Sequence, residues 1–99
     1  MEIKKPAVAG TLESSDCQIV IRPNGGEGIE IELESDVAVM FGDSIRETVN
    51  NTLEEFGVKD AYVETRDKGA LDCVIKARME CVICRGAEEK YDWTKEDAR

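Results

Sequence analysis

The clearest signal in the chain is an alternation of apolar and polar side chains in short runs. In residues 29–34, two isoleucines and a leucine alternate with three glutamates, and residues 17–22 and 59–66 alternate in the same way. Because successive side chains of a strand point to opposite faces, each run predicts a strand with one apolar face. Residues 7–13 are a weaker strand candidate, in which a bulge or a close backbone approach would explain Gly10.

A four-residue spacing of apolar side chains predicts the first helix. Ser35 or Asp36 is expected to cap its start, and Gly57 follows its last apolar position as a typical stop. Gly42 is a weak point within it that would allow close packing against the sheet. The shared apolar face consists of Val37, Phe41, Ile45, Val49, Leu53 and Phe56.

A second, broader apolar face predicts another helix nearer the C-terminus. Asp67 or Gly69 is expected to open this helix, and Arg85 and Gly86 are expected to close it. Its face consists of Leu71, Val74, Ile75, Arg78, Val82 and Ile83.

The elements follow one another in the order β-β-β-α-β-α, which is not a strict alternation of strands and helices. We therefore predict an α+β fold, with a mostly antiparallel sheet of about four strands and two helices packed on one face. Residues 1–86 are expected to form this domain, and the charged residues 87–99 a flexible acidic tail. Trp93 in that tail is open to two interpretations, a docking anchor or a frayed end without a role.

Composition and charge limit the kinds of partner that the chain is expected to have. Ninety-nine residues suit one domain, and a formal net charge of −9 argues against a nucleic-acid partner and for docking on basic surfaces. No apolar run approaches the roughly 18 residues of a membrane span, and the first residues lack the apolar block of a signal peptide. A cytoplasmic protein without membrane association is expected.

The chain contains no histidine. This removes the commonest general base, the Ser-His nucleophile pair and the usual nitrogen ligand of metals. An autonomous hydrolase or metalloenzyme is therefore not expected.

Four cysteines are present, and Cys81 and Cys84 have the C-x-x-C spacing. A redox pair of this kind normally opens a helix, whereas this pair lies toward the end of one, among apolar residues. A second pair for zinc is missing. We expect these two cysteines and Cys73 to be small buried core residues with free thiols.

Two charged segments are candidates for binding a cation, a phosphate or a partner. The glutamates of residues 29–34 predict a solvated sheet face, because nothing else in the chain completes a cation site with them. Residues 67–72 hold acids on both sides of Lys68 and are open to two interpretations. They are either a turn with a helix start, or a surface near a helix N-terminus where Lys68 holds a phosphate or a partner.

Residues 10–16 lie between the first two predicted strands and contain the turn-forming run Ser14-Ser15-Asp16. The run predicts a tight reversal with a hydroxyl at an exposed hairpin tip. Local chemistry alone indicates an ordinary surface turn.

Several separated blocks then point to one family. They are residues 6–14 (PAVAGTLES), 41–46 (FGDSIR), 67–73 (DKGALDC) and 77–80 (ARME). In this order they resemble the acyl carrier (gamma) subunit of citrate lyase, over most of the chain to about residue 85.

The resemblance implies that Ser14 carries a covalent prosthetic group, 2'-(5''-phosphoribosyl)-3'-dephospho-CoA, joined by a phosphodiester. The family pattern usually continues as Ser-Gly-Asp. Here Ser15 replaces the glycine and Asp16 is kept, which places two hydroxyls side by side. The alignment selects Ser14 for the attachment, with Ser15 as the alternative.

The resemblance also implies the reaction and the partners. An alpha subunit, an acyl transferase, would exchange acetate for citrate on the arm, and a beta subunit, a citryl lyase, would release oxaloacetate and restore the acetyl thioester. A further transferase would attach the prosthetic group, and the chain itself would break no bond. Two alternatives remain open, a carrier subunit of malonate decarboxylase and a plain acidic interaction domain.

Overall fold

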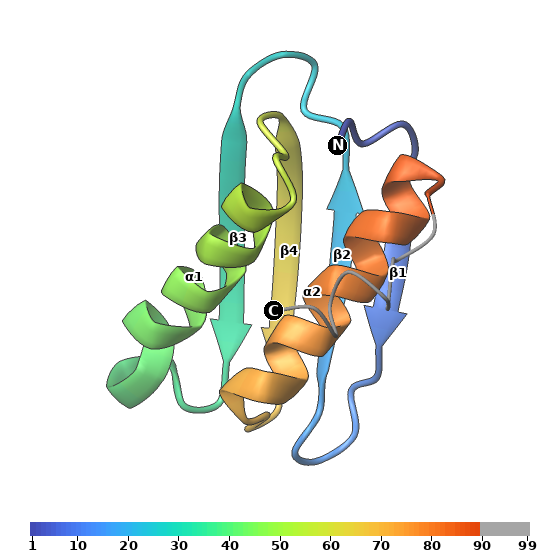
Figure 1. Ribbon diagram of the computed structural model, residues 1–99. Coiled ribbons are helices and arrows are strands. Elements are labelled where there is room, and N and C mark those ends of the chain that lie inside the picture. Colours follow the sequence, from blue (N-terminus) through green and yellow to red (C-terminus); the bar gives the residue numbers. More distant parts are fainter. Residues whose placement is uncertain (90–99) are drawn as a thin grey trace.

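The computed structural model describes residues 1–89 and confirms the predicted order of elements (Figure 1). The expectations for Trp93 and for most of the acidic tail lie outside the described residues. The elements are β1 (Ala7–Gly10), β2 (Cys17–Arg22), β3 (Ile29–Ser35), α1 (Ala38–Glu55), β4 (Ala61–Asp67) and α2 (Asp72–Ala87).

The four strands form one sheet in the order β1-β2-β4-β3. The pairs β1–β2 and β2–β4 are antiparallel, and β3 pairs with β4 in parallel across the crossover helix α1. The prediction of a mostly antiparallel sheet is confirmed. The parallel pair follows from the helix between β3 and β4, which returns the chain to the end where β3 began.

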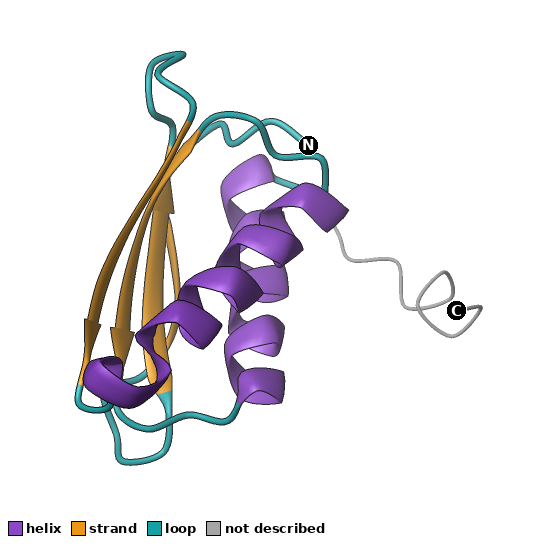
Figure 2. Ribbon diagram, turned by 90° about the vertical axis from the view of Figure 1, so that its left-hand side faces the viewer, coloured by secondary structure: helices purple, strands orange, loops and turns teal. Residues whose placement is uncertain are grey.

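Both helices cover the same face of the sheet, as Figure 2 shows. Helix α1 packs on β3, α2 packs on β1 and β2, and the helices contact each other. The alternating strands point their apolar side chains into this core, where Ile19, Ile21 and Val63 are fully buried beside Ile75 of α2. Burial of each such side chain stabilises the fold by about 1.5–3 kcal/mol. The β3 glutamates are exposed on the opposite face, as predicted.

The ends of α1 match the predictions in part. Gly57 stops the helix with φ of 68°, and the Gly57 and Val58 amides donate to the carbonyls of Glu54 and Leu53. At the start, neither Ser35 nor Asp36 is the cap. Val37 occupies the cap position without a side-chain bond, because Ser35 lies two residues before it and its hydroxyl accepts from the Val37 amide instead.

Helix α2 begins later and ends later than predicted. It starts at Asp72, not at Asp67 or Gly69, because Asp67 is the last residue of β4. It runs on through Gly86, where a Cβ atom would lie 3.1 Å from Ile21 and 3.2 Å from Ile3. Gly86 therefore permits close packing and does not stop the helix.

Two predicted apolar faces extend past the core. Phe41 is 51% exposed and Leu71 is 70% exposed, whereas Ile45 and Val49 are buried. For Phe41, Figure 1 shows that the first turn of α1 projects beyond β3. Met79, absent from the predicted face, is fully buried.

The cysteine prediction holds for Cys84, which is buried, and in part for Cys81; Cys17 is buried as well. For Cys73 it is wrong, because this residue is exposed. Cys73 precedes the buried Ile75 by two helical positions, which turns it about 200° away from the sheet. Burial, with the nearby carboxylates Asp16 and Asp67, raises the pKa of the Cys17 thiol to about 11.

None of the helices in residues 1–89 is long and apolar enough to cross a bilayer. The same residues contain no group of three metal-ligating side chains arranged to hold an ion.

Candidate functional site

Residues 11–16 connect β1 to β2 at the end of the sheet where β3 and β4 also finish and both helices begin (Figure 1). The Asp16 amide donates to the Glu13 carbonyl at 3.1 Å and closes a turn around Ser14 and Ser15. Both serines are exposed. The predicted hairpin tip with an exposed hydroxyl is confirmed. Within residues 1–89, no side chain or backbone group hydrogen-bonds the Ser14 hydroxyl.

Ser15 holds the turn in an unusual backbone conformation, with φ of 65°. This left-handed region costs a residue with a Cβ atom roughly 1–2 kcal/mol, so glycine is favoured there. The conformation directs the Ser15 amide to the Lys68 carbonyl at 2.8 Å. Ser14 lies outside the left-handed region, so the two serines are not equivalent.

Asp16 ties the turn to α2. Its carboxylate receives two hydrogen bonds from Arg78, from Nε at 3.1 Å and from Nη2 at 2.9 Å. The Thr11 hydroxyl and the Cys17 amide each donate to it at 2.7 Å. These donors, Arg78 above all, hold the pKa of the Asp16 carboxyl well below its usual range. The hydrogen bonds to Asp16 in turn raise the pKa of Arg78. Asp16 is therefore ionised at neutral pH, two residues from Ser14.

Lys68 supplies the second anchor through its backbone. Its amide donates to the Asp16 carbonyl at 2.9 Å and its carbonyl accepts from Ser15, which extends the β2–β4 pairing into the loop. The Lys68 side chain lies 3.7 Å from the Asp36 carboxylate. The helix N-terminus predicted beside Lys68 lies further along, at Asp72.

The buried carboxylate of Asp67 joins the loop after β4 to the end of β3. It accepts from the Ser35 hydroxyl at 2.8 Å and from the amides of Gly69 at 3.1 Å and Ala70 at 2.9 Å. The end of β3 and the loop after β4 are thus held together by one acid that is 1% exposed.

Gly10 allows β1 to enter the turn. Its φ is 87°, and a Cβ atom at this position would lie 1.9 Å from the Cys17 carbonyl oxygen. The close backbone approach predicted at Gly10 is therefore confirmed.

Asp16 is poorly suited to take the proton of the Ser14 hydroxyl. Asp16, the acid tied into the turn, is a weak base because every donor around it stabilises its ionised form. The chain also contains no histidine. The arrangement suits a hydroxyl that accepts a group from a separate enzyme.

Arg78 was missed as part of the site by the sequence reasoning, which placed it on the apolar face of the second helix. The position of Arg78 on that apolar face could have identified it. A lone arginine among apolar positions needs an acidic partner from another element. That partner is Asp16, 62 residues away in the chain.

The comparisons with known proteins identify the family. Residues 4–86 match the acyl carrier protein model described as malonate decarboxylase delta subunit (MdcD). The citrate lyase acyl carrier protein of Clostridium perfringens is 50% identical over 94 residues, 94% of this chain and 93% of that protein. The one from Weissella paramesenteroides is 57% identical over 88 residues, 89% of this chain and 90% of that protein.

The chain belongs to the citrate lyase acyl carrier protein family. The resemblance stated from the separated sequence blocks is thereby confirmed, and with it the role of a carrier subunit. The fold is shared more widely. A Pseudomonas malonate decarboxylase hetero-tetramer in complex with malonate contains a chain that matches with a TM-score of 0.74 at 16% identity, over 84% of each chain.

Proposed function

We propose that this chain is the acyl carrier subunit of citrate lyase and that Ser14 carries 2'-(5''-phosphoribosyl)-3'-dephospho-CoA through a phosphodiester. The observation that supports it best is the geometry of the turn. The Ser14 hydroxyl is exposed and has no hydrogen-bond partner within residues 1–89, while Asp16–Arg78 and Ser15–Lys68 hold the backbone beside it.

The residues present fit such a group. A phosphodiester to serine needs only a free hydroxyl with open space around it, and the turn offers both. The terminal thiol of the bound group supplies the chemistry by holding acyl groups as thioesters. The protein holds the point of attachment, and a tether of this kind raises the local concentration of its cargo at each partner.

Attachment requires a separate enzyme. The Ser14 oxygen forms the new P–O bond, its proton passes to a base of that enzyme, and the phosphate leaving group of an activated donor departs with the electron pair. Asp16 is unsuited to be that base, because its lowered pKa makes it a poor proton acceptor. The role of Asp16 and Arg78 is to position the backbone of the turn.

The partners in this proposal are the alpha acyl transferase and the beta citryl lyase, which together cleave citrate to acetate and oxaloacetate in the cytoplasm. A carrier role in malonate decarboxylase is the second candidate, favoured by the description of the matching family model. Citrate lyase is preferred because relatives with that name are about half identical, whereas the matched malonate decarboxylase chain is 16% identical.

Intact mass of the chain purified from citrate-fermenting cells tests the proposal, followed by fragmentation of the peptide that contains residues 11–16. We expect an adduct on the wild type and on Ser15→Ala, and none on Ser14→Ala. A wild-type chain of unmodified mass would overturn the carrier role. An adduct that survives Ser14→Ala and disappears with Ser15→Ala would move the site to Ser15.

A further inference from the structure

Exposed large apolar side chains gather at the Ser14 end of the molecule. The described residues contain six of them, and only Val8 lies away from this end, on the open face of the sheet. Leu12 belongs to the turn segment itself. The other four are Val39, Met40, Phe41 and Leu71, and two of these, Phe41 and Leu71, line one cleft and form what we call the Phe41 patch. Contiguous exposed apolar surface on a soluble domain usually marks an interaction site.

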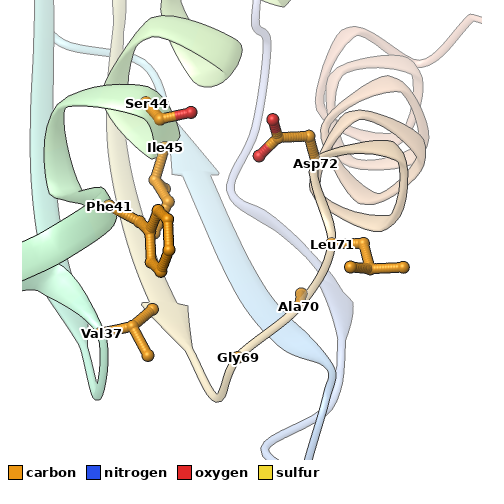
Figure 3. A pocket seen from close by; sticks show the side chains of 8 residues that line it. All are labelled: Val37, Phe41, Ser44, Ile45, Gly69, Ala70, Leu71 and Asp72. Atoms are coloured by element: carbon orange, nitrogen blue, oxygen red, sulfur yellow. The ribbon is translucent and has the colours of Figure 1, made fainter.

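A cleft of about 420 Å³ runs through the Phe41 patch (Figure 3). Val37, Phe41 and Ile45 form the α1 side, and residues 69–71 form the other side. The cleft is open because Gly69 and Ala70 are too small to fill the space opposite the Phe41 ring. Figure 3 shows Ser44 and the Asp72 carboxylate at the opposite end of the cleft from Val37 and Gly69. Its volume and mainly apolar walls suit the insertion of an apolar group.

The segment that anchors the turn also borders the cleft. The Ser15 amide binds the carbonyl of Lys68, and the next residue, Gly69, already lines the cleft. A protein that reaches the Ser14 hydroxyl therefore also reaches the cleft.

The surroundings of the patch are acidic. Asp36, Asp43 and Asp72 are exposed near it, and the chain has a net charge of −9. Two of the nearby cations are paired with acids, Lys68 with Asp36 and Arg78 with Asp16. A complementary surface would carry an apolar projection among lysine and arginine side chains.

A standard protein interface is about as wide as this carrier. A standard interface covers roughly 800 Å² on each partner, which is a disc ~30 Å across. The carrier measures 33 × 32 × 20 Å. An enzyme that brings its active site onto Ser14 therefore covers the whole of this end of the molecule.

We propose that the Phe41 patch is the docking surface for the enzyme that attaches the prosthetic group to Ser14, and that this enzyme inserts an apolar side chain, ringed by basic residues, into the cleft. This inference rests on the proposed function. It adds a surface for recognition, separate from the residue that is modified.

The test measures steady-state modification of the full chain by the purified attaching enzyme and its activated donor, with intact mass as the readout. Phe41→Ala and Leu71→Ser are expected to raise KM for the carrier about tenfold with little change in kcat. Val8→Ser is the matched control, because it removes an exposed valine of the same chain outside the patch, and its KM is expected to stay at the wild-type value. Thermal unfolding of each variant checks that the fold is kept.

Charge reversal of acids near the cleft provides a second test. Asp43→Lys and Asp72→Lys are expected to raise KM several-fold at low salt and to flatten its dependence on salt. Glu30→Lys, on the open sheet face, is the matched control and is expected to change KM much less.

Three results would overturn the docking surface while leaving the proposed function intact. The first is a wild-type KM for the patch variants, or an equal defect in Val8→Ser. The second is self-association of the wild-type chain through the patch, seen by light scattering and lost in Phe41→Ala. The third is protection of residues 37–45 from hydrogen exchange in the modified chain alone, which would assign the cleft to the attached arm. A wild-type chain that accepts no group on Ser14 would instead overturn the proposed function.

Discussion

The two ends of the sheet carry connections that are built alike but constrained differently. At the end away from Ser14, residues 24–28 join β2 to β3, and the Asp60 carboxylate accepts from the amides of Asn24 and Gly28 at 3.0 Å and 3.1 Å. At the Ser14 end, Asp16 has a similar role for its own loop. It is also paired with Arg78, a cation on a helix far away in the sequence.

Backbone strain also differs between the two ends of the sheet, and it is greater at the Ser14 end. Gly25, Gly26 and Gly28 have positive φ, and a Cβ atom on any of them would meet nothing within 4 Å. At the Ser14 end, Ser15 takes positive φ with a side chain, and Gly10 is closed in by the Cys17 carbonyl. One connection needs only to reverse the chain, whereas the other holds an exposed hydroxyl in a fixed place.

Alanine at Gly10 gives the strongest test of this contrast. We expect Gly10→Ala to lower the free energy of unfolding by about 3–5 kcal/mol, because a clash at 1.9 Å adds to an unfavourable φ. Gly25→Ala is the matched control at the other end and is expected to cost about 1 kcal/mol, from φ alone. Urea unfolding of both variants measures the difference. Equal losses would show that Gly10 is no more confined than Gly25.

Removal of the Asp16 charge is expected to have the next largest effect. Asp16→Asn weakens two hydrogen bonds to Arg78, a half-exposed side chain, and we expect a loss of about 1–2 kcal/mol at pH 7. The pKa of Asp16 is lower in the folded than in the unfolded chain. Its contribution is therefore complete above the unfolded pKa, about 3.9, and disappears as pH falls below it.

Urea unfolding between pH 3 and pH 7 measures this pH dependence. The gap between wild type and Asp16→Asn should narrow as pH falls below about 4. A constant gap would mean that the charge of Asp16 contributes nothing to holding the turn.

Glycine at Ser15 tests the strain within the turn. We expect Ser15→Gly to stabilise the chain by about 1 kcal/mol, because φ of 65° suits glycine. Ser14→Gly is the control, expected to be neutral or destabilising, because Ser14 lies outside the left-handed region. Thermal unfolding distinguishes the two, and no gain for Ser15→Gly would contradict the strain.

Alanine at Gly42 tests whether tight constraint extends over the whole Ser14 end or is confined to the turn. A Cβ atom there would lie 3.7 Å from Ala38 and 3.8 Å from Leu33, which is ordinary contact. Gly42→Ala is therefore expected to stabilise α1 by about 0.5–1 kcal/mol. Gly86→Ala in α2 is the control and is expected to destabilise, because its contacts are as short as 3.1 Å. A loss of stability in Gly42→Ala would extend the constraint into α1.

The sequence alone determined the strands, the helices, most of their buried positions and the exposed turn at Ser14. These features depend on neighbours in the chain, because a period of two or of 3.6 residues decides which side chains share a face. The stop at Gly57 and the close approach at Gly10 were predictable for the same reason, since each is a local backbone requirement. The family resemblance came from separated blocks of sequence.

Only the tertiary structure decided the parallel pairing of β3 with β4, the burial of Asp67 and the exposure of Phe41. It also decided that Arg78 holds Asp16. Each of these depends on where one element lies against another, and local periodicity carries no information about such contacts. The turn could be predicted as a place for a free hydroxyl, but what holds it still comes from a helix 62 residues away.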